Sequence, residues 1–323
     1  MNLLGVAKLL LLFVLPWFIS FSPPAHSAAS SSSHPGYENR VAVLMYHHIS
    51  DTDRGPAVIT PRLFQAHLDT LKKEGYHVIS TERLARFLSG KDTIPPKAVV
   101  ITFDDGYESF YTYAYPELKK RNMPATCFVI VKSVGDPKEK IPKLTWEQMR
   151  EMQANGMSFY PHSYDSHYQA RFAPGVPAAR YTRPALAGPI WLDKLNRRET
   201  QEEYETRVRA DLLKAKEVME MELGRPMDHF CWPYGADSPT AARIARSLGY
   251  KYLYYIRKGL NAPSTADGFI RRINAGSPNV TPEILTRKIE KYSLLTSARQ
   301  WCLVLSPLYP ALLKPTFVAL DSI

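Results

Sequence analysis

The stretch AVVITFDDGY, residues 98–107, places two adjacent carboxylates directly after an apolar run. Residues Ala98–Phe103 are rich in β-branched side chains and predict a strand that is buried on both faces. Taken alone, Asp-Asp-Gly is most often a solvated turn. Two like charges at the end of a buried strand repel each other unless a cation compensates them, so Asp104 and Asp105 indicate a functional site at this strand end.

The same pattern of short apolar runs between helix signals extends along the chain. Further strands are expected at 41–45, 77–79, 125–131 and 251–256, and helices are expected to begin after Thr60, Thr145, Thr200 and Ser238. Strands that alternate with helices predict parallel βαβ units. We therefore expect an α/β fold, a distorted and incomplete (β/α) barrel, with its chemistry at the carboxyl ends of the strands.

The two ends of the chain differ in composition from its centre. Residues 1–27 resemble a secretory signal peptide, with Lys8 before an apolar run and small residues at its end. An uncleaved membrane anchor is the alternative. Residues 28–40 are expected to be a linker, 41–293 the main domain, and 294–323 an apolar tail that packs on it. The protein is thus expected to be secreted or periplasmic.

Composition places few limits on partners. The 323 residues are 45% hydrophobic and carry a formal net charge of +10. The charge is too evenly spread to indicate a nucleic-acid partner, whereas peripheral association with a membrane or the cell envelope is compatible with it. Three cysteines without C-x-x-C spacing argue against a disulfide framework and a cysteine zinc site. We expect Cys127 and Cys231 to be buried.

Two further segments carry candidate chemistry, HSYDSH at 162–167 and WPYG at 232–235. Two histidines and one carboxylate can hold a catalytic metal and leave coordination positions open for water and substrate. Two histidines five residues apart are a weak signal alone, because this step puts them on different faces of a helix. Pro161 disfavours a helix there and favours a loop. Trp-Pro-Tyr-Gly alone is usually a turn beside a core aromatic residue.

Together, these motifs resemble the polysaccharide deacetylases with a NodB homology domain, carbohydrate esterase family 4. Within that family the chain is most similar to the poly-β-1,6-N-acetyl-D-glucosamine N-deacetylases of biofilm matrix. The resemblance covers roughly residues 41–293, and the five-residue histidine step favours this subgroup. The motifs that support this resemblance are LMYH (44–47), TFDDG (102–106), His162 with His167, WPYG (232–235), LGY (248–250) and RRIN (271–274).

The resemblance implies a role for each matched residue. Asp104 is the general base, and Asp105, His162 and His167 are ligands of a divalent metal ion, which is Zn, Co, Ni or Fe. The backbone N–H of Tyr234 stabilises the oxyanion. The remaining residues, which we expect to contact substrate or to line the pocket, are Trp232, Pro233, Tyr107 and Arg271. For Arg271 the alternative is that it belongs to the block that orients the catalytic Asp.

The general acid is not implied, because this chain has no histidine after His229. Metal-bound water and protonated Asp104 are the two options. Of the histidines after the first strand, His47 or His48 either approaches the site or is structural, and His229 is expected in the core.

The predicted reaction is metal-dependent hydrolysis of the acetamide groups of poly-β-1,6-N-acetyl-D-glucosamine, with release of acetate. The enzyme would be a hydrolase that acts on carbon–nitrogen bonds other than peptide bonds. The first alternative keeps this chemistry on chitin, peptidoglycan or xylan. The second is a non-catalytic protein for polysaccharide binding or export.

Overall fold

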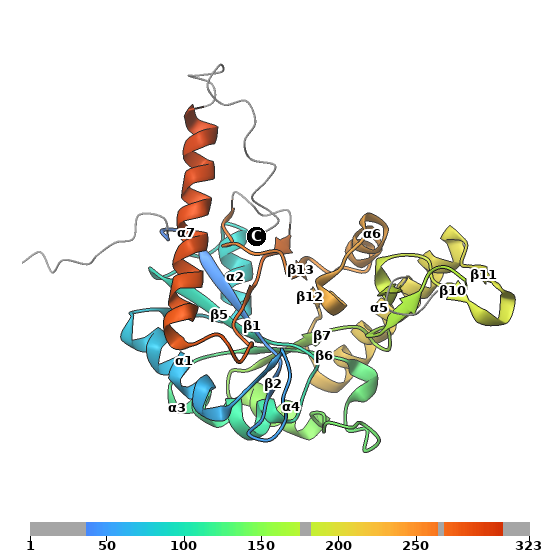
Figure 1. Ribbon diagram of the computed structural model, residues 1–323, viewed down its shortest axis with the longest axis horizontal. Helices are drawn as coiled ribbons and strands as arrows, with labels where there is room; N and C mark the ends of the chain where they lie inside the picture. Colours follow the sequence, from blue (N-terminus) through green and yellow to red (C-terminus); the bar gives the residue numbers. More distant parts are fainter. Residues whose placement is uncertain (1–36, 175–181, 264–267, 306–323) are drawn as a thin grey trace, which may run out of the picture. The chain divides into compact units, whose positions relative to one another are not determined.

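The computed structural model describes residues 37–174, 182–263 and 268–305, with side chains up to residue 293. The expected signal peptide, most of the expected linker and residues 306–323 lie outside this part of the chain, as does the side chain of Cys302. The strands lie at the centre and the helices lie around them (Figure 1).

The main sheet is parallel and has the order β15-β1-β5-β6-β7, with β4 also paired to β5. Strand β5 pairs with β1 along its whole length, and on its other side first with β4 and then with β6. All six residues of β5 are buried, as the sequence predicts. The strands are β1 (Val41–Tyr46), β4 (His77–Val78), β5 (Ala98–Phe103), β6 (Thr126–Val129), β7 (Ser158–Pro161) and β15 (Ile273–Asn274).

A second parallel sheet contains β12 (His229–Cys231), β13 (Tyr252–Tyr254) and β14 (Phe269–Ile270). Strand β12 lies close to β7, but no ladder joins them in the described part of the chain. We call this opening the seam. The strands therefore follow a barrel that is not closed, which confirms the predicted α/β fold with an incomplete barrel.

The four helices predicted after Thr60, Thr145, Thr200 and Ser238 begin there, because their capping groups are local. Thr60 and Ser238 cap helices that have proline at their first position, and Thr145 with Gln148 and Thr200 with Glu203 form complete capping boxes. The helices are α1 (Pro61–Lys73), α2 (Thr81–Leu88), α3 (Tyr115–Lys120), α4 (Trp146–Ala154), α5 (Gln201–Leu223), α6 (Pro239–Ser247) and α7 (Pro282–Leu305).

The described part of the segment between His167 and α5 contains short strands. It contains two short antiparallel pairs, β8 (Gln169–Arg171) with β9 (Thr182–Pro184) and β10 (Trp191–Leu192) with β11 (Arg197–Arg198). A further short parallel pair, β2 (His48–Ile49) with β3 (Val58–Ile59), follows β1.

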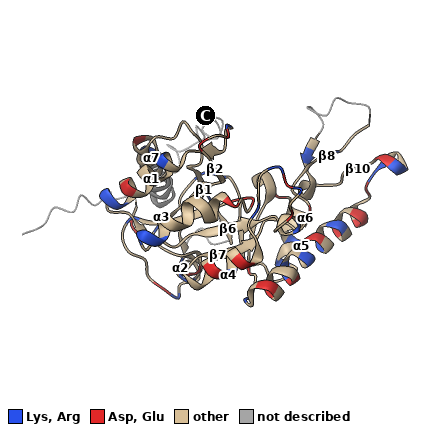
Figure 2. Ribbon diagram, turned by 90° about the horizontal axis from the view of Figure 1, so that it is seen from below, with Lys and Arg blue, Asp and Glu red and all other residues tan. Residues whose placement is uncertain are grey.

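Helix α7 crosses the boundary at residue 293 that was predicted between domain and tail, and it packs against α1. Within the described residues, no helix has both the length and the apolarity that a membrane crossing requires. Lys and Arg alternate with Asp and Glu along α5, so charge of both signs is mixed on this helix (Figure 2).

Candidate active site

The polar residues of the candidate site follow the carboxyl ends of four strands. His47 follows β1, Asp104 and Asp105 follow β5, His162 follows β7, and Trp232 follows β12. In parallel sheets these ends lie on one side, which is where barrel enzymes place their chemistry. The predicted base and the three predicted metal ligands are therefore brought together.

Asp104 is held by a buried arginine. Arg272 donates from Nη1 to Oδ1 at 2.6 Å and from Nη2 to Oδ2 at 2.9 Å, and both residues are almost fully buried. Burial alone would raise the pKa of Asp104, but the charge of Arg272 outweighs it and the net pKa is lowered. Asp104 is therefore an ionised carboxylate, with His47 Nε2 3.8 Å from Oδ2.

Asp105 turns away from its neighbour because its backbone is left-handed. Its φ is 71°, and Lys143 Nζ donates to its carbonyl oxygen at 3.0 Å. The next residue, Gly106, has φ 66°, and a Cβ there would lie 3.0 Å from Val129 Cγ1. A left-handed pair at a strand end requires glycine at one position and explains why Asp-Asp-Gly occurs here.

The two histidines converge on Asp105. His162 Nε2 lies 3.5 Å and His167 Nε2 3.2 Å from Asp105 Oδ1, and the ring centroids are 4.9 Å apart. His162 Nδ1 lies 2.7 Å from the carbonyl oxygen of Cys231, which only accepts, so Nδ1 carries the proton and Nε2 a lone pair. Burial lowers the pKa of His162 to about 4, so the ring is neutral at pH 7.

This arrangement fits a divalent metal ion. One ligand atom from each of Asp105, His162 and His167 lies within 4.8 Å of the others. Asp105 Oδ1 is buried and has no hydrogen-bond donor among the described residues, as expected for an oxygen that faces a cation. Two imidazole nitrogens and one carboxylate leave positions open, which is typical of a catalytic site.

A second group of possible ligands, Asp104, His162 and Cys231, also lies within 4.8 Å. Here both oxygens of Asp104 already accept hydrogen bonds from Arg272, so the carboxylate is balanced by a cation. The first group is therefore the one that suits a metal, and Asp104 is left beside it without a ligand role.

Tyr234 lies at the mouth of the site. Its backbone is left-handed (φ 58°, ψ 12°), and none of the hydrogen bonds within the described residues uses its N–H. Its ring stacks on His167 at 4.6 Å and is 42% exposed. This N–H therefore has no acceptor among the described residues, and its predicted role toward an oxyanion stays a prediction.

The four residues predicted to contact substrate lie in different surroundings. Trp232 is fully buried against Phe230, and Pro233 is also buried, so neither ring is open to a sugar in this conformation. Tyr107 is partly buried beneath Lys143, whose Nζ is 3.7 Å from the ring centroid. Burial and the Asp105 carboxylate raise the pKa of Tyr107.

Arg271 is a neighbour of the functional arginine and does not itself contact Asp104. Its N–H donates to Asn261 Oδ1 at 2.9 Å, and the guanidinium on Asp104 comes from Arg272. Residues that alternate along an extended segment point in opposite directions, which separates the two. One consideration from the sequence could have indicated such an arginine: a carboxylate buried at Asp104 needs a neighbouring cation.

The remaining histidines are also assigned by their contacts. His47 is the one that approaches Asp104, whereas His48 contacts Ser109 and Asp53 through its two nitrogens. His229 is buried and stacks on Tyr252, which confirms its place in the core. The buried thiols of Cys127 and Cys231 are likewise as expected.

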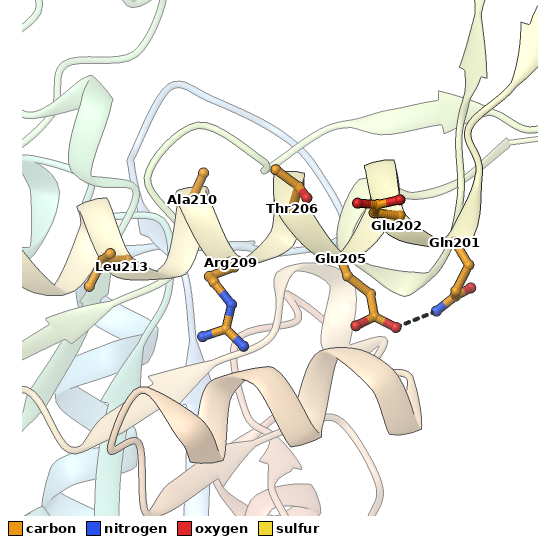
Figure 3. A pocket seen from close by; sticks show the side chains of 7 residues that line it. All are labelled: Gln201, Glu202, Glu205, Thr206, Arg209, Ala210 and Leu213. Carbon is orange, nitrogen blue, oxygen red and sulfur yellow. Dashed lines mark hydrogen bonds between the residues drawn. The ribbon is translucent and has the colours of Figure 1, made fainter.

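A separate hollow of about 690 Å³ lies on α5 (Figure 3). It contains none of the predicted site residues, and charged side chains line part of it. The lining residues are Gln201, Glu202, Glu205, Thr206, Arg209, Ala210 and Leu213.

Comparison with known proteins agrees with this geometry. Residues 91–253, just over half of the chain, match the family model described as polysaccharide deacetylase. The poly-β-1,6-N-acetyl-D-glucosamine N-deacetylase of Escherichia coli K12 is 27% identical over 275 residues, which is 81% of this chain and 40% of that protein. This chain therefore spans well under half the length of that relative.

Solved structures are also similar. A de-N-acetylase from Aggregatibacter actinomycetemcomitans has a TM-score of 0.70 and 27% identity, with 77% of this chain and 100% of that chain covered. IcaB from Ammonifex degensii has a TM-score of 0.63 and 28% identity, with 77% and 97% covered. The chain belongs to the polysaccharide deacetylase family.

Proposed function

We propose that this protein is a metal-dependent N-deacetylase of poly-β-1,6-N-acetyl-D-glucosamine that releases acetate. The observation that carries the proposal is the division of the Asp-Asp pair. Asp104 is paired with Arg272, whereas Asp105 faces two imidazole nitrogens and has an oxygen without a donor. One carboxylate is thus suited to proton transfer and the other to a cation.

Asp105, His162 and His167 would hold the metal ion. When bound, a divalent cation polarises the acetamide carbonyl and makes water a stronger acid. The neutral state of His162 and the charge of Asp105 are those that such ligands require.

Asp104 would accept the proton of the attacking water. A general base must be ionised and lie within reach of that proton, and the Arg272 pair keeps Asp104 in its charged form and in one orientation. The N–H of Tyr234 would donate to the oxygen that gains charge as the tetrahedral centre forms.

His47 is our candidate for the proton donor to the leaving amine. Its Nε2 lies 3.8 Å from Asp104 Oδ2, and its buried Nδ1 has no partner in the described part of the chain. His47 follows β1 and approaches Asp104, whereas His48 contacts Ser109 and Asp53 instead. This adds a third option to the two acids considered from sequence.

The choice of polymer rests on similarity. The E. coli relative is named for poly-β-1,6-N-acetyl-D-glucosamine, and the five-residue step between His162 and His167 is the one expected for that subgroup. Such a polymer lies outside the cytoplasm, in accord with the signal-like residues 1–27. If the signal is cleaved as proposed, N-terminal sequencing of the mature protein should begin at Ala28; a start at Met1 would favour the anchor.

The decisive test is acetate release by the purified protein from oligomers of this polymer with Zn²⁺, Co²⁺ or Ni²⁺. Chitin, peptidoglycan and acetylated xylan form the comparison panel. Faster acetate release from one of these polymers would identify that polymer as the substrate and leave the proposed reaction unchanged. If no substrate releases acetate and Asp104→Asn leaves polymer binding intact, the protein is a binding module.

A further inference from the structure

The loop between the two histidine ligands is held by a buried carboxylate from a distant helix. Asp211 of α5 accepts from Tyr164 N at 3.0 Å through Oδ2, and from Asp165 N at 2.9 Å and Ser166 Oγ at 2.7 Å through Oδ1. Asp211 is buried and forms no ion pair among the described residues. All three of its donors belong to residues 164–166.

The opposite side of the same loop is held by backbone groups. Val131 N donates to the carbonyl of Ser163 at 3.1 Å, and Lys132 N donates to that of Tyr164 at 3.0 Å. Ser163 has φ 95°, a conformation that L-residues rarely adopt and that the surroundings must maintain. The loop is thus fixed from two sides. Lys132 also pairs with Asp165 at 2.6 Å, but both of those side chains are exposed, whereas Asp211 is buried and accepts from the loop itself.

The spacing of the ligands makes this restraint important. His162 follows β7 directly, and its own N–H donates to Val129 at 2.8 Å, so the sheet fixes its position. His167 lies at the far end of the loop, and its Nε2 reaches Asp105 only if residues 163–166 keep their present path. Metal sites depend on such outer contacts, which typically change affinity by about 10- to 100-fold.

We propose that Asp211 is a positioning residue for the metal site: it orders residues 164–166 so that His167 meets His162 and Asp105. This inference rests on the metal site of the proposed function. Asp211 does not touch the ligands themselves and acts through the loop.

The test is a titration of the metal-free full chain with Co²⁺, followed by its visible spectrum without substrate. Asp211→Asn keeps the size of the side chain but replaces one acceptor oxygen by an NH₂ group that faces backbone donors. We expect the affinity for Co²⁺ to fall by about 10- to 100-fold, with an altered spectrum. Glu217→Gln is the matched control, because it removes an exposed carboxylate from the same helix and should bind as the wild type does.

A merely structural role would change a different quantity. In that case Asp211→Asn would unfold at a lower temperature but bind Co²⁺, below that temperature, with wild-type affinity and spectrum, and the proposal would be overturned. If Asp211→Asn does not fold, the Co²⁺ affinity of Ser166→Ala becomes the test. This variant removes the hydroxyl that donates to Asp211 and leaves the carboxylate in place. A severalfold loss of affinity supports the proposal, and wild-type affinity overturns it.

The wild-type titration separates this inference from the proposed function. If the wild type binds Co²⁺ and the Asp211 and Ser166 variants bind equally well, only the positioning role fails. If the wild type itself does not bind, the metal-dependent function and the positioning role both fail.

Discussion

Asp104 and Asp105 are neighbours in the chain but have opposite partners. The first is paired with a guanidinium, and the second faces the Nε2 atoms of two imidazoles. The left-handed backbone of Asp105 separates the two side chains, and Arg272 balances the charge of Asp104. A cation bound by Asp105 and the two histidines would balance the second charge.

Substitutions of the two carboxylates should therefore change different properties of the enzyme, turnover for Asp104 and metal binding for Asp105. Asp104→Asn should bind Co²⁺ as the wild type does and lose at least about 100-fold in kcat, since general-base catalysis supplies 10²–10⁴. Asp105→Ala should lose metal affinity. Calorimetric titration with the metal and acetate release measure the two effects. Equal loss of metal binding in both variants would refute the division of roles.

Arg272 and Arg271 form a natural matched pair. Arg272→Met removes the partner of a buried carboxylate, which typically costs about 3–5 kcal/mol, and should also lower kcat because Asp104 loses its orientation. Arg271→Met leaves that pair intact and should retain kcat. If Arg271 contacts substrate as the sequence predicts, only KM should rise. Urea unfolding and steady-state kinetics distinguish the two, and a larger loss of kcat in Arg271→Met would reverse the assignment.

At the scale of elements, local signals were predictable and distant pairings were not. Capping residues act within one turn, so the starts of α4 and α5 could be predicted from Thr145 and Thr200. The pairs β8–β9 and β10–β11 consist of two- or three-residue strands. Such strands are too short to show the alternation of apolar and polar residues that identifies a strand in sequence. The contacts of Arg272 and Asp211 depend on how elements far apart in sequence pack, and no local pattern encodes that.

Glu82 joins three elements on the side of the sheet away from the motifs. It accepts from Ser158 of β7 at 2.6 Å and from Arg225, which follows α5, at 2.7 Å. Burial would raise its pKa, but the hydrogen bonds from Ser158 and Arg225 lower it from 4.5 to about 2. A carboxyl with a lowered pKa stabilises the fold above its unfolded value and loses that effect as the pH falls through its folded value.

Glu82→Gln should therefore destabilise the protein at pH 7 by on the order of 2 kcal/mol, reduced from the full shift because the side chain is partly exposed. The difference in the free energy of unfolding between Glu82→Gln and the wild type should be constant above about pH 5 and should shrink between pH 4.5 and about 2. Urea unfolding at a series of pH values measures it. A difference that stays constant down to pH 2 would show that the charge of Glu82 is not responsible.

At the scale of the whole molecule, the site bridges the seam. His162 follows β7 on one edge, and the Cys231 carbonyl that sets its tautomer ends β12 on the other. The fold class and the convergence of Asp104, Asp105, His162 and His167 were predictable, because an apolar strand before Asp-Asp and a histidine pair are each visible in sequence. The seam was not, because it depends on which strands fail to pair.

A metal ion bound at this position should stabilise the whole fold, because its ligands come from separate strands. At 100 times its Kd it adds about 2.7 kcal/mol, or roughly 5–10 °C in Tm for a domain of this size. Thermal unfolding with and without a chelator measures the shift. Asp105→Ala should show none of it, whereas Asp104→Asn should show it in full. An equal shift in both variants would place the metal elsewhere.

The Arg272–Asp104 pair also has a consequence for synthesis. The two residues are 168 positions apart, and a ribosome adds roughly 5–20 residues per second. For roughly ten to thirty seconds, each growing chain holds the carboxylate without the arginine that makes its burial favourable. The central strand can thus reach its final environment only after nearly all of the domain has been made. Asp104 therefore becomes ordered late, and chains that stop before residue 272 hold this carboxylate without its buried partner.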